Sequence, residues 1–253
     1  MRIGVVGVGV IASAVVRGLE RKYGDKADFF LSPRNAEKSM ALQGAYGNVR
    51  VMETNQAVVD ASDIVIVSVL PKVAKEVVSS LRFSSRHHIV SFVSEPRLAS
   101  LAEWVGECAT ISRVIPLEFI EHHAGPVLLY PDTPVVHDLL VGLGEVVVPE
   151  SEDDFLAMQA LSSVMGGFFY LADSIVAWTG TKGIKEDVAA PYLFAMFKAL
   201  AGQGLETSPE DVASLWKAMT PGGLNEDVIR SIKNAGGFAL WTSALDKVLE
   251  RLR

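Results

Sequence analysis

The chain opens with the stretch Met1-Arg2-Ile3-Gly4-Val5-Val6-Gly7-Val8-Gly9-Val10-Ile11-Ala12. A β-branched apolar run passes directly into Gly-x-Gly-x-x-Ala, and a helical pattern follows from Ser13 to about Arg21. Gly7 permits a tight turn after the strand, Gly9 lets the backbone approach a pyrophosphate, and Ala12 lets the helix pack closely. The N-terminal N–H groups of that helix then face the phosphates. This order of signals predicts a dinucleotide-binding site; the alternative is a glycine-rich turn without a ligand.

The end of the second predicted strand, Ala27–Leu31, indicates which dinucleotide is bound. In NAD-preferring proteins an Asp or Glu at this point accepts hydrogen bonds from the ribose hydroxyls. This chain has Ser32-Pro33-Arg34-Asn35 instead. Hydroxyl, guanidinium and amide groups are donors, and arginine forms charge-assisted pairs with phosphate oxygens. We therefore expect NADP(H), held by Ser32, Arg34 and Asn35, unless Arg34 is only a solvated loop residue.

Composition limits the protein's class. The chain has 253 residues, 49% of them hydrophobic, and a net charge of −7. Its length is enough for a full core in one large domain or two unequal ones. The acidic balance, with a pI near 5.3, argues against a nucleic-acid surface. The single Cys108 excludes an internal disulfide, and we expect a cytoplasmic protein without a membrane segment or secretory signal.

Two kinds of periodicity divide the chain. Up to about Glu150, short β-branched runs alternate with helical stretches, which is typical of a mostly parallel sheet with crossover helices. We expect strands at Arg2–Val6, Ala27–Leu31, Asp63–Val69, His88–Phe92, Thr110–Val114, Pro126–Tyr130 and Glu145–Val148. After that point only helical patterns remain, at Asp153–Trp178, Lys185–Leu200, Ser208–Met219, Asn225–Lys233 and Phe238–Leu252. The sequence thus predicts an α/β domain over residues 1–151 and an all-helical domain over residues 152–253.

The first predicted helix of the second half is apolar nearly all round. A surface helix would show only an apolar stripe, so this helix should be buried in the domain or between subunits. We therefore expect the chain to form at least a dimer through residues 152–253.

An ordered series of short motifs resembles the pyrroline-5-carboxylate reductase family along most of the chain. The motifs are the glycine turn through Ala12, the Ser32–Asn35 loop, Asn55, the run from Ala61 to Pro71, Arg113-Val114-Ile115-Pro116, Ala160-Leu161-Ser162 and Thr220-Pro221-Gly222-Gly223. The resemblance implies an N-terminal Rossmann domain, a helical domain that interlocks with its twin in a homodimer or higher oligomer, and reduction of a cyclic imino acid to proline with NAD(P)H.

The same resemblance implies a set of cofactor contacts. They are Gly7, Gly9, Val10, Ile11, Ala12, Ser32, Arg34, Asn35, Asn55, Val69, Leu70 and Pro71. The chain departs from the family mainly in the substrate segments. Its strand end reads Val69-Leu70-Pro71 where the family has Val-Lys-Pro, and Asn225 stands where the family has a threonine. A small imino acid is the implied substrate, and an altered C=N substrate is the alternative.

Two glycine-containing segments are candidates for holding the substrate carboxylate through free helix N–H groups. The residues concerned are Ser162, Ser163, Thr220, Gly222 and Gly223, and the resemblance implies that Asn225 contacts the substrate amine. Each segment has a plainer interpretation. Thr220–Gly223 could be an ordinary break between helices. Ser162 and Ser163 could be serines inside a helix that donate back to a carbonyl.

The proton donor is left open by the sequence. His122 and His123 follow a predicted strand end, and Glu118 and Glu121 lie in the same stretch, but exposure in a loop accounts for them equally well. The histidine pairs lack metal-ligand spacing, so we expect no metal site. A catalytically silent relative that binds NADP(H) as a sensor or partner module is the alternative function.

Overall fold

The computed structural model describes all 253 residues, and the chain divides into two compact units. Unit 1 comprises Met1–Gln159 and Leu249–Arg253, and unit 2 comprises Ala160–Val248. We call them the nucleotide unit and the helical unit and describe each by itself.

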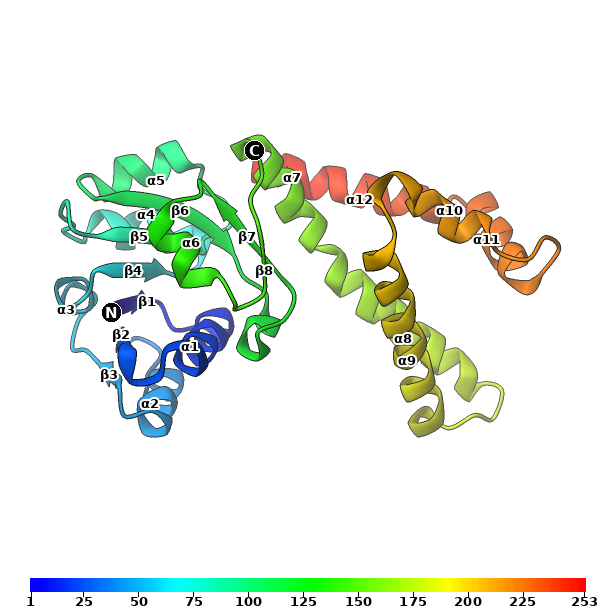
Figure 1. Ribbon diagram of the computed structural model, residues 1–253, viewed down its shortest axis with the longest axis horizontal. Coiled ribbons are helices and arrows are strands. Elements are labelled where there is room, and N and C mark those ends of the chain that lie inside the picture. Colours follow the sequence, from blue (N-terminus) through cyan, green and yellow to red (C-terminus); the bar gives the residue numbers. More distant parts are fainter. The chain divides into compact units, whose positions relative to one another are not determined.

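The nucleotide unit is built on one eight-stranded sheet with the strand order β3-β2-β1-β4-β5-β6-β7-β8 (Figure 1). The strands are β1 (Arg2–Val6), β2 (Asp28–Leu31), β3 (Val49–Val51), β4 (Ile64–Val67), β5 (His88–Ser91), β6 (Thr110–Ile115), β7 (Pro126–Tyr130) and β8 (Glu145–Val147). Every pair is parallel except β6 with β7. The predicted mostly parallel α/β sheet is confirmed, and its first six strands follow the doubly wound order. The short strand β3 was missed because only three residues pair.

Helices cover both faces of this sheet. They are α1 (Val10–Tyr23), α2 (Ala36–Ala45), α3 (Asn55–Ala61), α4 (Pro71–Ser79), α5 (Leu98–Val105), α6 (Pro134–Leu140) and the first part of α7 (Glu152–Ser162), with short 3₁₀ helices η1 (Gly24–Lys26) and η2 (Glu118–His122). The side chains of β4 alternate between the faces, as a strand buried on both sides requires. Ile64 and Ile66 join α1 and α6 in one apolar cluster, and Val65 and Val67 join α3 and α4 in the other.

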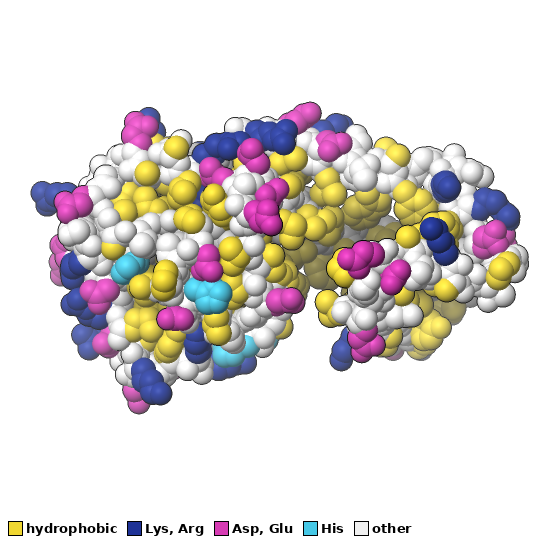
Figure 2. Space-filling model, turned by 45° about the horizontal axis from the view of Figure 1, so that its top comes forward, with side chains coloured by type: hydrophobic (Ala, Val, Ile, Leu, Met, Phe, Trp, Pro, Cys, Tyr) yellow, Lys and Arg dark blue, Asp and Glu magenta, His cyan; other side chains and the backbone are white.

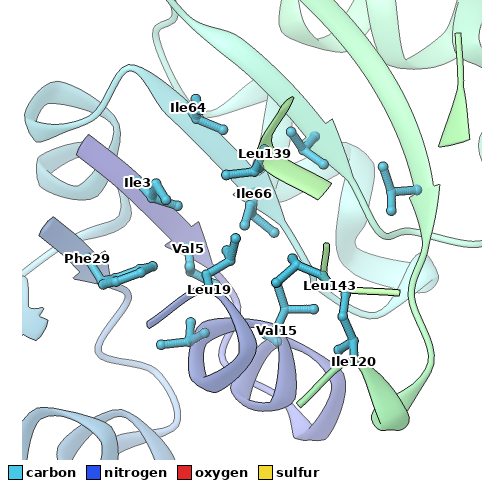
Figure 3. Packing of buried hydrophobic residues seen from close by; sticks show 14 of the residues in the cluster. Ile3, Val5, Val15, Leu19, Phe29, Ile64, Ile66, Ile120, Leu139 and Leu143 are labelled. Atoms are coloured by element: carbon cyan, nitrogen blue, oxygen red, sulfur yellow. The ribbon is translucent and has the colours of Figure 1, made fainter. Parts of the chain in front are cut away.

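The cluster on the α1 face positions the glycine turn. Val15 and Leu19 of α1 pack against Ile3 and Val5 of β1, with Ile120 of η2 at the same helix (Figure 3). At Gly18, an added Cβ would lie 2.6 Å from the Ile120 carbonyl oxygen. Helix α1 can therefore pack this closely on η2 only because residue 18 has no side chain.

The helical unit consists of the end of α7, α8 (Val164–Gly180), α9 (Glu186–Glu206), η3 (Pro209–Asp211), α10 (Val212–Lys217), α11 (Leu224–Asn234) and most of α12 (Gly237–Leu252). The predicted Asp153–Trp178 helix is broken at Ser163, whose hydroxyl and N–H both donate to the Ala160 carbonyl. The predicted Ser208–Met219 helix is η3 followed by α10. Ser208 is the N-cap residue of η3, but its side chain makes no capping hydrogen bond, because its hydroxyl donates to the carboxylates of Glu210 and Asp211.

Hydrophobic side chains of the helical unit are mostly exposed. Its buried apolar residues are Ala160, Ala172, Ala189 and Leu193. Tyr170, Tyr192, Leu205, Leu224 and Leu240 are each 70% exposed or more, and Figure 2 shows hydrophobic side chains over much of the visible surface of this unit. By length and composition alone, Glu152–Gly180, which comprises α7 and α8 (29 residues, mean hydropathy 1.4), is also apolar enough to cross a membrane, and one such segment is weak evidence.

Gly18→Ala should lower the free energy of unfolding by about 1–3 kcal/mol, because the new methyl group must push η2 away from α1. Gly44→Ala in α2 is the matched control, since nothing lies within 4 Å of its added Cβ. There the same substitution should stabilise the protein by about 0.5–1 kcal/mol. Chemical denaturation measures both changes, and equal effects at the two sites would contradict the packing argument.

Candidate functional site

The glycine turn after β1 has the conformation that its sequence predicts. Gly7 has φ +93°, and an added Cβ would lie 2.5 Å from the Ser68 carbonyl oxygen. Only glycine fits this position. At Gly9 nothing lies within 4 Å of an added Cβ, so the backbone there faces open space.

Helix α1 begins at this open space without a protein partner for its positive end. Its N-cap, Gly9, has no side chain, and its first turn contains no acidic residue. The N–H groups of the first turn are therefore free to bind an anion, which the helix dipole favours.

A cavity of about 440 Å³ lies over this turn at the carboxyl ends of β1, β2 and β4. It is lined by Gly7, Val8, Gly9, Arg34, Asn35, Ala36, Ser68, Val69, Leu70, Lys72 and Val73. Six of the predicted cofactor contacts therefore come together: Gly7, Gly9, Arg34, Asn35, Val69 and Leu70. The lining contains two cationic side chains and no carboxylate.

The three predicted phosphate ligands of the β2–α2 loop differ in their surroundings. Ser32 is buried, and its hydroxyl accepts a 2.9 Å hydrogen bond from the Gly7 N–H. Asn35 donates through Nδ2 to the Val8 carbonyl at 2.9 Å. Arg34 is exposed and has no ion pair or side-chain hydrogen bond within the chain. Ser32 and Asn35 thus fasten the loop to the glycine turn, and Arg34 is the group free to meet a ligand.

The remaining predicted cofactor residues lie outside the lining. Ala12 is buried in the core, and Ile11 packs against it. Val10 borders a separate, smaller hollow between α1 and α2. Asn55 and Pro71 are the first residues of α3 and α4. Their contact with a cofactor stays a prediction.

Sequence reasoning missed Lys72 and Val73 in the cavity wall. Both residues follow Leu70, the N-cap of α4, and Pro71, its first residue. The feature of the sequence that could have identified this part of the wall is a lysine just beyond the predicted strand end. Proline suits the first helical position, and Pro71 marks where α4 begins.

The predicted substrate residues of the helical unit fall in two places. Ser163 sits at the α7–α8 break and donates to the Ala160 carbonyl at 2.6 Å, and Ser162 precedes it. Thr220, Gly222, Gly223 and Asn225 form one turn at the start of α11. In that turn the Gly223 N–H donates to the Thr220 carbonyl at 2.9 Å.

Two side chains occupy this turn. Glu226, which sequence reasoning missed, accepts the Gly222 N–H at 2.5 Å, as an acidic residue early in a helix often does. Asn225 donates to the Met219 sulfur at 3.4 Å. A hollow of about 230 Å³ next to the turn is lined by Trp216, Lys217, Met219, Pro221, Glu226 and Ile229.

Two of the four candidate proton donors near β6 have structural partners. Glu121 pairs with Arg17 at 3.1 Å, and His123 donates through Nε2 to the Gly18 carbonyl at 2.8 Å. Both contacts attach η2 to α1. His122 and Glu118 are exposed. No cluster of three or more His, Cys, Asp or Glu residues could hold a metal ion.

Comparison with known proteins places this site in context. Residues 2–95 match the family model "NADP oxidoreductase coenzyme F420-dependent". The pyrroline-5-carboxylate reductase of Pseudomonas aeruginosa is 25% identical over 99% of this chain and 95% of its own length. That of Glycine max is 27% identical over 93% of this chain and 89% of its own length.

Solved structures share the fold of the whole chain. The 1-pyrroline-5-carboxylate reductase of Streptococcus pyogenes superimposes with a TM-score of 0.84 at 23% identity, covering 100% of this chain and 98% of its own. The Plasmodium falciparum pyrroline carboxylate reductase with NADP bound gives 0.84 at 18% identity, covering 100% and 97%. The chain is therefore similar to pyrroline-5-carboxylate reductases in motif order, in sequence over nearly its whole length and in fold.

Proposed function

We propose that this protein is an NADPH-dependent reductase of a cyclic imino acid, converting 1-pyrroline-5-carboxylate to proline. The observation that carries the proposal is the cavity over Gly7 and Gly9, with free helix N–H groups, an unpaired Arg34 and no carboxylate in its wall. A dinucleotide phosphate fits this donor set. The full-length reductase relatives support the choice of reaction.

NADPH, when bound, supplies the hydride that reduces the imine carbon. The imine nitrogen takes up one proton from solvent or an acid, so that a C=N bond becomes CH–NH. The protein's own residues contribute by binding the cofactor and the substrate and by orienting them for hydride transfer. On the nucleotide unit, Gly7 and Gly9 let the phosphates approach the backbone, and Leu70, 64% exposed, offers an apolar surface in the same cavity.

We assign substrate binding to the turn at the start of α11. Asn225 carries an amide that can donate to or accept from a ring nitrogen. The backbone N–H groups of the turn suit a carboxylate. Glu226 already accepts the Gly222 N–H, so a substrate carboxylate would compete with this side chain for that donor.

The reductase should consume NADPH when 1-pyrroline-5-carboxylate is added, and Asn225→Ala should lower kcat/KM about tenfold while NADPH affinity stays unchanged. Asn234→Ala, at the other end of the same helix, is the control and should leave both unchanged. Steady-state absorbance at the NADPH band measures turnover. Tight NADPH binding without turnover of any cyclic imine would favour the silent binding module instead.

The cofactor preference should follow Arg34. We expect the wild-type protein to bind NADPH at least about tenfold more tightly than NADH, because arginine pairs with the 2′-phosphate. Arg34→Ala should remove most of this difference, whereas Arg21→Ala, in the last turn of α1, should not. Fluorescence titration of the three proteins with both nucleotides gives six affinities, and a preference that survives Arg34→Ala would rule out the phosphate assignment.

We also propose that the helical unit is completed by a second copy of the chain. With four small or medium apolar residues buried and many large ones exposed, it cannot bury a core alone. If the interlocked dimer of the family forms, the Thr220–Asn225 turn would come from the partner subunit.

Light scattering at micromolar concentration should therefore return a multiple of the 27.2 kDa chain mass. Tyr192→Glu in α9, where the side chain is 74% exposed, should shift the protein toward monomer because a charge would be buried in the interface. Met40→Glu, 63% exposed on α2 of the nucleotide unit, is the control and should leave the mass unchanged. A wild-type monomer would end this proposal.

A further inference from the structure

The cavity over the glycine turn contains a second cation whose role no motif explains. Lys72, the second residue of α4, lines the same cavity as Arg34. They are the only charged side chains in its wall. Neither forms an ion pair within the chain, so their positive charge is not balanced by the protein.

Sheet order puts these two cations on separate loops with the glycine turn between them. Strand β1 lies between β2 and β4 in the sheet. Arg34 follows the carboxyl end of β2, and Lys72 follows that of β4. A ligand group that enters the cavity over Gly7 can therefore be approached by a cation from each side.

The position of Lys72 is unfavourable for the helix that carries it. The N-terminus of α4 is the positive end of its dipole, and a cation in the first turn is destabilising there. Its first turn has no acidic residue, and its N-cap, Leu70, makes no side-chain capping hydrogen bond. An anion bound in the cavity would interact favourably with both the helix dipole and the Lys72 ammonium group. The protein itself supplies no negative charge that does so.

We propose that Lys72 acts with Arg34 as the second ligand of the 2′-phosphate of NADP(H), and so sets the discrimination between NADPH and NADH. The inference rests on the proposed cofactor. The pyrophosphate has its own donors, the glycine turn and the N-terminus of α1. The β2 end carries the residue that contacts the adenosine ribose in this class of sheet, and that residue is Arg34 here. Lys72, which lines the same cavity as Arg34, is therefore assigned to the extra phosphate.

Binding of nucleotide fragments tests the assignment without catalysis. Isothermal titration compares 2′,5′-ADP, which carries the 2′-phosphate, with 5′-AMP, which lacks it. Lys72→Met should weaken the binding of 2′,5′-ADP about tenfold and that of 5′-AMP less than about twofold. Only 2′,5′-ADP carries the 2′-phosphate, so only this nucleotide loses a charge-assisted contact with Lys72. Lys75→Met is the matched control, because Lys75 lies on the same helix but outside the cavity wall, and should change neither. Lys72→Arg should restore the difference between the two fragments.

Three results would overturn the proposal. Equal weakening of both fragments by Lys72→Met would place the lysine on the 5′-phosphate. Unchanged affinities would make it a solvated surface residue. A wild-type protein that binds 2′,5′-ADP no more tightly than 5′-AMP would remove the 2′-phosphate site altogether. Failure of the reductase proposal is a separate result, because it would appear as absent turnover in a protein that still discriminates between these fragments.

Discussion

A buried guanidinium holds the nucleotide unit together at the edge where its site lies. Arg113, at the carboxyl end of β6, is fully buried, pairs with Glu152 at 3.0 Å and donates to the Ser94 carbonyl at 2.9 Å. Its Cζ atom lies over the Phe155 ring, 4.6 Å from the ring centre. Burial lowers the pKa of this arginine, and the Glu152 carboxylate opposes that shift. Removing either partner would leave a buried charge alone, which typically costs about 3–5 kcal/mol. Sheet, β5–α5 loop and the first turns of α7 are thereby tied into one body.

The same loop receives further attachments from both chain segments that border the helical unit. Arg97 pairs with Asp153 at 2.9 Å at the start of α7, and Glu95 pairs with Arg251 at 2.7 Å near the end of the chain. These two pairs are largely exposed and contribute little each. A hydrogen bond beside these pairs also attaches the loop to α7: the Ser94 carbonyl accepts from the side-chain amide of Gln159. Residues 152–159 and Leu249–Arg253 of the nucleotide unit are thus both anchored at the carboxyl edge of its sheet, where an α/β protein binds its ligand.

Sequence reasoning succeeded where a local rule fixes the structure. The glycine turn, seven of the eight strands and the helical pattern of the C-terminal half follow from periodicity and from residues such as Gly7, whose backbone no other residue could adopt. It failed where the partner lies far along the chain. The sequence around Arg113 does not indicate that its partner is Glu152, 39 residues away. Likewise, the sequence around Ser32 does not indicate that its hydroxyl accepts a hydrogen bond from Gly7. The strand β3 was missed because three residues carry too little pattern. Lys72 escaped because a lysine early in a helix reads as solvated surface unless the cavity it lines is known.

The proposed site has two halves with different physical requirements. The nucleotide half is preformed, because Gly7, Ser32 and Asn35 are locked by hydrogen bonds within one packed unit. The substrate half rests on a turn of α11 whose own unit buries almost no large side chain. Large apolar side chains around this turn, among them Trp216, Leu224 and Val228, are exposed. If a second copy covers them, assembly and substrate binding are one process, and dilution should impair turnover before it impairs nucleotide binding. That order of loss follows from where the hydrophobic surface lies, independently of which cyclic imine the enzyme reduces.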